Sequence, residues 1–202
     1  MESYTHVPAD VKAFAAEYVA AWNAKDTARL MGMAVPQSGA CITAATKPVY
    51  DEIQRTEMLD EVAPGYTLML MPVNETNLKA MRQMHMGYFL VKPERELHID
   101  YQYPQTNDGG QLALYLVHEN GRWMTDFPCM TEKAIQDYKD DAPGRQHYKD
   151  IAASIKNPLR SELLAMLQKH QSGEAAQRYK AAAGCDMNTA MRVVYALSGR
   201  MP

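Results

Sequence analysis

The sequence has 202 residues, of which 47% are hydrophobic, and its formal net charge at pH 7 is −3. A chain of this length and composition can bury one large core, or a medium core and a small one, which excludes disorder throughout. The isoelectric point lies near 6.1, and the lysines and arginines are scattered rather than gathered in a run. This charge distribution argues against nucleic acid as the main partner.

The N-terminal stretch MESYTHVPADVKAF has neither the basic nor the apolar region of a secretory signal peptide. No apolar run approaches the roughly 18 residues that a membrane-spanning helix needs. We therefore expect a cytoplasmic protein with no membrane partner. Cys41, Cys129 and Cys185 are odd in number and far apart, so we expect reduced thiols rather than a disulfide framework or a zinc site.

The first third of the chain predicts helices. Residues 9–24 carry apolar side chains at helical spacing on one face, so they form an amphipathic helix that needs a sheet or another helix to cover it. Asp26 can cap a short second helix over residues 27–34. Pro48 can open a third helix over roughly residues 47–60.

From residue 66 onward the hydrophobic period changes from helical spacing to two. This alternation predicts strands at residues 66–73, 84–91, 97–103, 111–118 and 122–127. The second of these is ambiguous, because residues 77–84 also fit one or two helical turns. The last two strands should pair as a hairpin across the turn Glu119-Asn120-Gly121.

The order of these elements predicts an α+β fold, with the N-terminal helices packed on one face of an antiparallel sheet. A last helix at residues 131–140 completes the first domain, residues 1–141. The polar segment 142–156 contains Pro143-Gly144 and predicts a linker. Residues 157–202 predict a small module of three short helices, whose core is small enough to favour docking on the first domain or on a partner.

Two stretches carry a family resemblance, EYVAAWNAKDTARLM at residues 17–31 and LALYLVHENGRWMTDFPC at residues 112–129. On these, residues 8–138 resemble the nuclear-transport-factor-2-like superfamily, which includes steroid isomerases, dehydratases and polyketide cyclases. The resemblance implies a curved sheet closed into a cone, with a pocket between sheet and helices where family enzymes place an Asp or a His-Asp pair. The fold also hosts binding proteins and non-catalytic modules, so it implies no particular activity.

The tail RYKAAAGCDMNTAMRVVYAL, residues 178–197, is similar to the helix–turn–helix of the ribosomal stalk protein's C-terminal domain. The matching packing positions are Tyr179, Ala182, Gly184, Ala190, Val194 and Leu197. Gly184 is expected to end a helix in the left-handed conformation. The sequence departs from the pattern at Cys185, Asp186, Met191 and Arg192. These departures remove the charged positions through which the stalk protein meets translation factors, so the resemblance implies an interaction-prone helical module.

Two residues are candidates for catalysis, His85 and Asp126. His85 lies in a methionine-rich region and could project into a cavity, although a hydrogen-bonded core or rim histidine is the favoured interpretation. Asp126 could be a pocket carboxylate with a raised pKa, or a solvated surface group, which is favoured. His98 and Asp100 could pair as a base and its orienting carboxylate. Their apolar neighbours must face the helices, so we expect both on the outer, solvated face.

Six aromatic residues could line a pocket in such a cone: Tyr18, Trp22, Tyr88, Tyr101, Tyr115 and Trp123. They could equally be core, which is the favoured interpretation. The sequence contains no phosphate-binding loop, dinucleotide fingerprint, zinc-hydrolase motif or serine-nucleophile motif. No cofactor and no metal are therefore expected.

Two functional hypotheses follow. In the first, the chain is a non-enzymatic protein-interaction or regulatory protein, which forms a homodimer through the sheet face and can bind a protein partner through its C-terminal helices. In the second, it is a small-molecule-binding protein or a cofactor-independent lyase or isomerase that abstracts a proton in an apolar pocket. The first is preferred, and the state of the cavity and of Asp126 distinguishes them.

Overall fold

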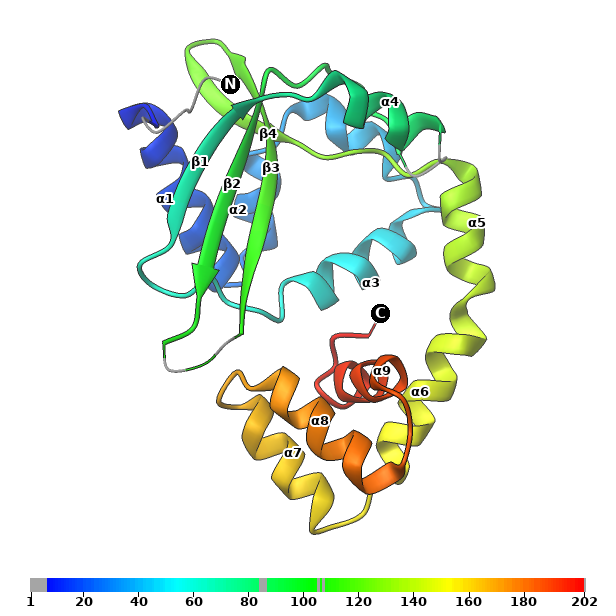
Figure 1. Ribbon diagram of the computed structural model, residues 1–202. Coiled ribbons are helices and arrows are strands. Elements are labelled where there is room, and N and C mark those ends of the chain that lie inside the picture. Colours follow the sequence, from blue (N-terminus) through cyan, green and yellow to red (C-terminus); the bar gives the residue numbers. More distant parts are fainter. Residues whose placement is uncertain (1–6, 84–86, 105, 107, 202) are drawn as a thin grey trace. The chain divides into compact units, whose positions relative to one another are not determined.

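A computed structural model of the chain describes residues 7–83, 87–104, 106 and 108–201 (Figure 1). The chain divides into two compact units. The first, which we call the sheet unit, consists of Met1–Asp51, Asp60–Tyr101 and Gly110–Tyr138. The second, the helical unit, consists of Glu52–Leu59, Gln102–Gly109 and Lys139–Pro202. Within the described residues, no helix is both long and apolar enough to cross a membrane.

The fold is α+β, as the sequence predicts. The elements in chain order are α1 (Ala9–Asn23), α2 (Thr27–Gly32), the 3-10 helix η1 (Pro36–Cys41), α3 (Lys47–Glu57), β1 (Thr67–Pro72), α4 (Glu75–Gln83), β2 (Arg95–Gln102), β3 (Gly109–Glu119), β4 (Arg122–Asp126), α5 (Glu132–Asp140), α6 (Ala142–Ser154), α7 (Leu159–Leu167), α8 (Ser172–Ala183) and α9 (Met187–Leu197). The predicted Asp26 cap is confirmed, because its side chain accepts a hydrogen bond from the backbone N–H of Arg29.

The four strands form one antiparallel sheet in the order β1-β2-β3-β4. Leu70 pairs with Leu97 between the first two strands, and Val117 pairs with Met124 between the last two. The predicted hairpin turn is confirmed. Asn120 and Gly121 have φ of 53° and 77°, the positive values that a type I′ hairpin turn requires at both central positions.

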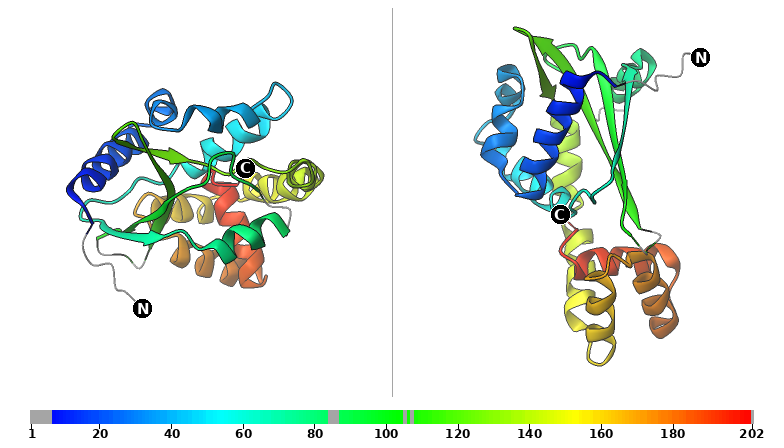
Figure 2. Two further views of the ribbon diagram at one scale, coloured as in Figure 1. Left: turned by 90° about the horizontal axis from the view of Figure 1, so that it is seen from above. Right: turned by 90° about the vertical axis from the view of Figure 1, so that its left-hand side faces the viewer.

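Helix α1 covers one face of the sheet, which we call the α1 face, and the right-hand view of Figure 2 shows α1 and α2 on the same side of the strands. The indole Nε1 of Trp123 on β4 donates to the Asp10 carboxylate of α1 at 2.8 Å. Leu97, Ile99 and Leu116 alternate onto the same face and are fully buried. The sheet therefore covers the apolar stripe of α1, as the sequence of this helix requires.

The chain after α2 runs along the outer edge of β4 and then passes to the opposite face. The backbone N–H of Thr125 donates to the carbonyl of Met33, and the N–H of Val35 donates to the carbonyl of Thr125, both at 2.9 Å. Val35 then packs on Val117 and Met124. This crossing places η1 over the second face of the sheet.

The predicted strand at residues 84–91 is wrong where the structure describes it. Residues 84–86, including His85, lie outside the described residues. The residues before them form α4, and from residue 87 onward only an isolated bridge joins Tyr88 to Cys129. The helical alternative for residues 77–84 is confirmed as far as residue 83, where Leu78 and Arg82 follow Glu75 at helical spacing.

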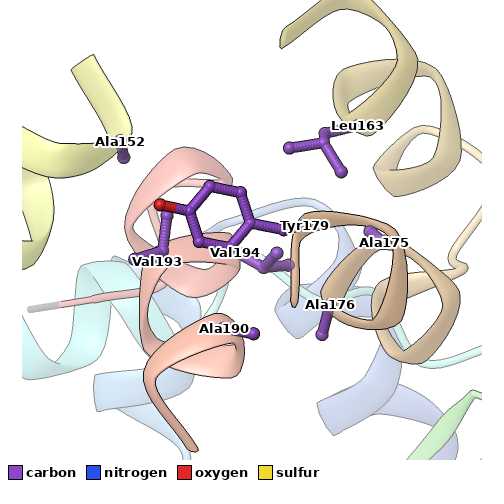
Figure 3. Close-up of a cluster of buried hydrophobic side chains, with 8 residues drawn as sticks. All are labelled: Ala152, Leu163, Ala175, Ala176, Tyr179, Ala190, Val193 and Val194. Carbon is purple, nitrogen blue, oxygen red and sulfur yellow. The ribbon is translucent and has the colours of Figure 1, made fainter. Parts of the chain in front are cut away.

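Four helices build the core of the helical unit (Figure 3). Its buried side chains are Ala152, Leu163, Ala175, Ala176, Tyr179, Ala190, Val193 and Val194. The predicted linker 142–156 is therefore wrong, because it contains α6, which contributes Ala152 to this core. Pro143 does not prevent the helix, since it lies in the first turn, where backbone N–H groups have no helical acceptor.

Gly184 ends α8 in the left-handed conformation, with φ of 68°, as the sequence predicts. A side chain at this φ is strained, so Gly184→Ala should lower the free energy of unfolding by about 1–2 kcal/mol. Gly173 in the first turn of the same helix provides the matched control. A Cβ there would make only an ordinary contact, 3.8 Å from the nearest Asp108 oxygen.

Urea denaturation of the full chain, followed by circular dichroism, measures both substitutions. We expect Gly173→Ala to be neutral or to stabilise the protein by up to about 1 kcal/mol, because alanine has the higher helix propensity. Equal losses of stability in the two variants would contradict the left-handed cap.

Candidate functional site

Three polar side chains lie in a row across the second face of the sheet. Tyr115 on β3 is directly opposite Asp126 on β4, and directly opposed residues of an antiparallel pair share a face. Burial raises the pKa of Tyr115, and the nearby carboxylate of Glu96 on β2 raises it further. We call Glu96, Tyr115 and Asp126 the second-face row.

Asp126 is sealed inside the protein. Only 2% of the residue is exposed, and Ser38 of η1, which is fully buried, donates its hydroxyl to Asp126 Oδ1. Burial raises the pKa of Asp126, and smaller opposing effects come from the Ser38 hydroxyl and the backbone N–H groups of Phe127 and Val91. Among the described residues Asp126 Oδ2 has no hydrogen-bond partner.

The expectation that Asp126 is a solvated surface group is therefore wrong. The position of Asp126 near the end of the last strand favoured a solvent-exposed side chain. The chain crossing at the edge of β4, however, brings η1 over its carboxyl group. The carboxyl is held by one hydroxyl and by backbone, in an environment that favours its neutral form.

A disulfide joins Cys41 at the end of η1 to Cys129 just after β4, with their Cα atoms 5.7 Å apart. The expectation of three reduced thiols is wrong for this pair, while Cys185 is free. The two cysteines are 88 residues apart in sequence, and only the packing of η1 over the second face brings them together. The disulfide therefore fastens the segment that covers Asp126.

Cys129 also anchors the segment that follows α4. Its backbone N–H donates to the carbonyl of Tyr88 at 2.8 Å, and the N–H of Tyr88 donates to the carbonyl of Cys129 at 3.0 Å. Gly87 permits this close approach, because a Cβ there would lie 3.1 Å from the Cys129 carbonyl oxygen. Phe89 then reaches the second-face row, with its ring centroid 4.6 Å from that of Tyr115.

His98 lies on the second face, away from α1, but it is not solvated as expected. Its Nε2 is 2.7 Å from Glu96 Oε1, and the two side chains are only 15% and 13% exposed. Asp100, the partner that the sequence suggested, instead accepts from Gln111 Nε2 at 2.6 Å. A carboxylate hydrogen-bonded to an imidazole nitrogen orients the ring.

The six aromatic candidates do not gather around one cavity. Tyr18 and Trp22 are buried on α1, with ring centroids 6.3 Å apart, and the indole of Trp22 donates to the carbonyl of Asp60 at 2.8 Å. Trp123 lies on the same sheet face, against Asp10 of α1. These three residues belong to the α1 side of the sheet unit.

The remaining three candidates have separate surroundings. Tyr101 covers the backbone of Gly110, where a Cβ would lie 2.5 Å from the tyrosine oxygen. Tyr115 belongs to the second-face row. Tyr88, 37% exposed, lines a groove beside α4.

This groove, which we call the α4 groove, has a volume of about 340 Å³. It is lined by Glu75, Leu78, Lys79, Met81, Arg82, Gly87, Tyr88, Phe89, Leu90, Lys92 and Pro93. Positions 75, 78, 79 and 82 follow one face of α4, which forms one wall, and residues 87–93 form the other. Figure 1 shows α4 following β1 at one end of the sheet.

The charged side chains of the α4 groove are unbalanced in sign. Three are cationic, Lys79, Arg82 and Lys92, and one, Glu75, is anionic. Lys92 Nζ lies 2.6 Å from Glu75 Oε1, and Lys92 together with Lys79 lowers the pKa of this carboxylate. None of these residues is among the sites predicted from the sequence, although the helical spacing that aligns Glu75, Lys79 and Arg82 on α4 is visible there.

In the described part of the chain, no group of three or more His, Cys, Asp or Glu side chains could hold a metal ion. When the chain is compared with known proteins, no family model, no curated protein and no solved structure matches it. The resemblance to the nuclear-transport-factor-2-like superfamily stays a prediction.

The disulfide should contribute strongly to stability because it closes a long loop. Reduction by a phosphine should lower the free energy of unfolding by about 2–5 kcal/mol. Cys185→Ser is the matched control, and it should remain as sensitive to reduction as the wild type. Thiol titration of the denatured, unreduced protein should detect Cys185 alone. Three reactive thiols in that titration would contradict the disulfide.

The raised pKa of Asp126 predicts a pH dependence with a defined sign. As pH rises above the ordinary aspartate pKa of 3.8, the unfolded chain loses this proton before the folded protein does, so stability falls until the folded group also ionises. Asp126→Asn cannot ionise but still offers Ser38 an oxygen acceptor. Its stability relative to the wild type should therefore increase between pH 4 and pH 8.

Urea denaturation at several pH values measures this difference. The exposed Asp150→Asn variant controls for a general change of charge. Parallel pH profiles of Asp126→Asn and the wild type would show that Asp126 ionises as readily in the folded protein as in the unfolded chain.

Proposed function

We propose that this chain is a non-enzymatic binding protein and that the α4 groove is its ligand site. The observation that carries the proposal is the contrast between the groove and Asp126. The groove is open and combines apolar with cationic walls, whereas the carboxyl group best suited to acid–base chemistry is sealed by Ser38.

Apolar exposure in the groove supports a binding role. Leu90 is 45% exposed and Tyr88 is 37% exposed, which makes them two of the large apolar side chains left in contact with solvent. Clustered exposed apolar groups beside polar ones mark ligand or protein sites. A bound ligand would remove these side chains from water.

The packing of the α1 face supports the same choice. We include a nuclear-transport-factor-2-like arrangement in the proposal. In such an arrangement, the pocket of an enzyme lies between the sheet and the helices. Val11 and Ala15 of α1 and Leu97 and Ile99 of β2 have no exposed surface. Apolar side chains therefore occupy the region where proton abstraction would need a substrate.

The position of Asp126 argues against proton transfer by this residue. A general acid or base must come within hydrogen-bond reach of the proton that it transfers. With 2% of its surface exposed and the Ser38 hydroxyl on Oδ1, Asp126 serves the attachment of η1 instead. The carboxyl contributes to the scaffold that supports the groove.

Binding of the neutral fluorophore N-phenyl-1-naphthylamine tests the proposed site. We expect saturable binding to the folded protein, and Leu90→Asn should weaken it about three- to tenfold, because it removes roughly 1 kcal/mol of apolar contact. Met31→Asn is the matched control, since Met31 is 42% exposed on α2 outside the groove. Equal weakening by both substitutions, or no binding at all, would refute the α4 groove as the site.

A further inference from the structure

The groove's charged side chains select for the chemistry of its occupant. The whole chain has a net charge of −3, yet the ionised groove side chains comprise Lys79, Arg82 and Lys92 against Glu75 alone, a surplus of two positive charges. A local positive region on an acidic protein attracts anions and repels cations.

The geometry gives the cations different roles. Lys92 is already paired with Glu75 at 2.6 Å. Lys79 follows Glu75 by four residues and Arg82 follows Leu78 by four residues, so both exposed cations lie on the α4 wall. They are therefore placed to meet an anionic group at the rim, and an Arg guanidinium can hold a carboxylate with two parallel hydrogen bonds.

Apart from Lys92, the opposite wall is mainly apolar, and the groove is small. Phe89, Leu90 and Pro93 face Leu78 and Met81 across the groove, and Pro93 is fully buried. A volume near 340 Å³ lies at the lower end of the roughly 300–1,000 Å³ typical of small-molecule sites. This volume suits a short aliphatic chain or a ring system better than a folded partner.

Resting on the function proposed above, we propose that the ligand is a small amphipathic carboxylate, with its apolar body between Leu78 and Leu90 and its anionic group at Lys79 and Arg82. Charge complementarity and the apolar opposite wall jointly specify this occupant. Glu75 weakens the binding of such a ligand, because its carboxylate is paired with Lys92 and repels the ligand's own carboxylate.

Displacement of N-phenyl-1-naphthylamine from the full-length protein tests the ligand class, with decanoate and decan-1-ol as probes. Decanoate should bind about tenfold more tightly than decanol at low salt, and added NaCl should reduce only the decanoate affinity. The double variant Lys79→Gln/Arg82→Gln should remove this preference. Glu75→Gln should strengthen decanoate binding and leave decanol binding unchanged.

The matched control is Lys12→Gln/Arg122→Gln, which removes the same charge from exposed positions outside the groove and should preserve the preference. If the fluorophore binds but decanoate and decanol displace it equally, the carboxylate inference is wrong while the proposed function stands. If the fluorophore binding is insensitive to Leu90→Asn, the proposed site itself fails. Tight binding of an acidic peptide with no displacement by decanoate would also overturn the small-ligand inference.

Discussion

The organisation of the sheet unit depends on Cys129, where three segments distant in sequence meet. Its sulfur is bonded to Cys41 at the end of η1, and its backbone pairs with Tyr88 through two hydrogen bonds. The hydroxyl oxygen of Tyr50 on α3 accepts from the backbone N–H of the next residue, Met130, at 2.7 Å. One short stretch after β4 thereby holds the cover of Asp126, the end of the groove wall and the start of α3.

This arrangement explains why the second face is sealed at one end and open beside α4. The disulfide keeps η1 over Asp126, where burial raises the pKa of the carboxyl group and the Ser38 hydroxyl donates a hydrogen bond to it. The same anchor holds Tyr88 and Phe89 beside α4, where no covering segment is described and Tyr88 stays exposed. A rigid attachment on one side permits a pre-formed groove on the other, and pre-formed sites bind with less loss of conformational entropy.

The local sequence pattern predicted many of the helices and turns, because neighbours in sequence determine these elements. The helical stripe of α1, the Asp26 cap, the alternation of β2 and the Glu119-Asn120-Gly121 turn all follow from spacing or turn chemistry. The prediction of a linker at residues 142–156 was wrong, because proline and glycine occur both in linkers and in the first turns of helices. The distinguishing fact is the burial of Ala152 among the other helices, a tertiary property.

The candidate site could be predicted much less well, since it is assembled by long-range contacts. Nothing local links Ser38 to Asp126 or Cys41 to Cys129, which are each 88 residues apart. His98 illustrates the intermediate case: alternation gave the correct face, but Glu96 and Asp100 are equally spaced from it, and only the packing selects Glu96.

The cationic character of the groove could not be predicted from the sequence for a similar reason. Lys79 and Arg82 align on one helical face, while Lys92 comes from the facing segment. A net negative chain can therefore carry a cationic site, and bulk charge bears on solubility and long-range encounter rather than on what one groove binds.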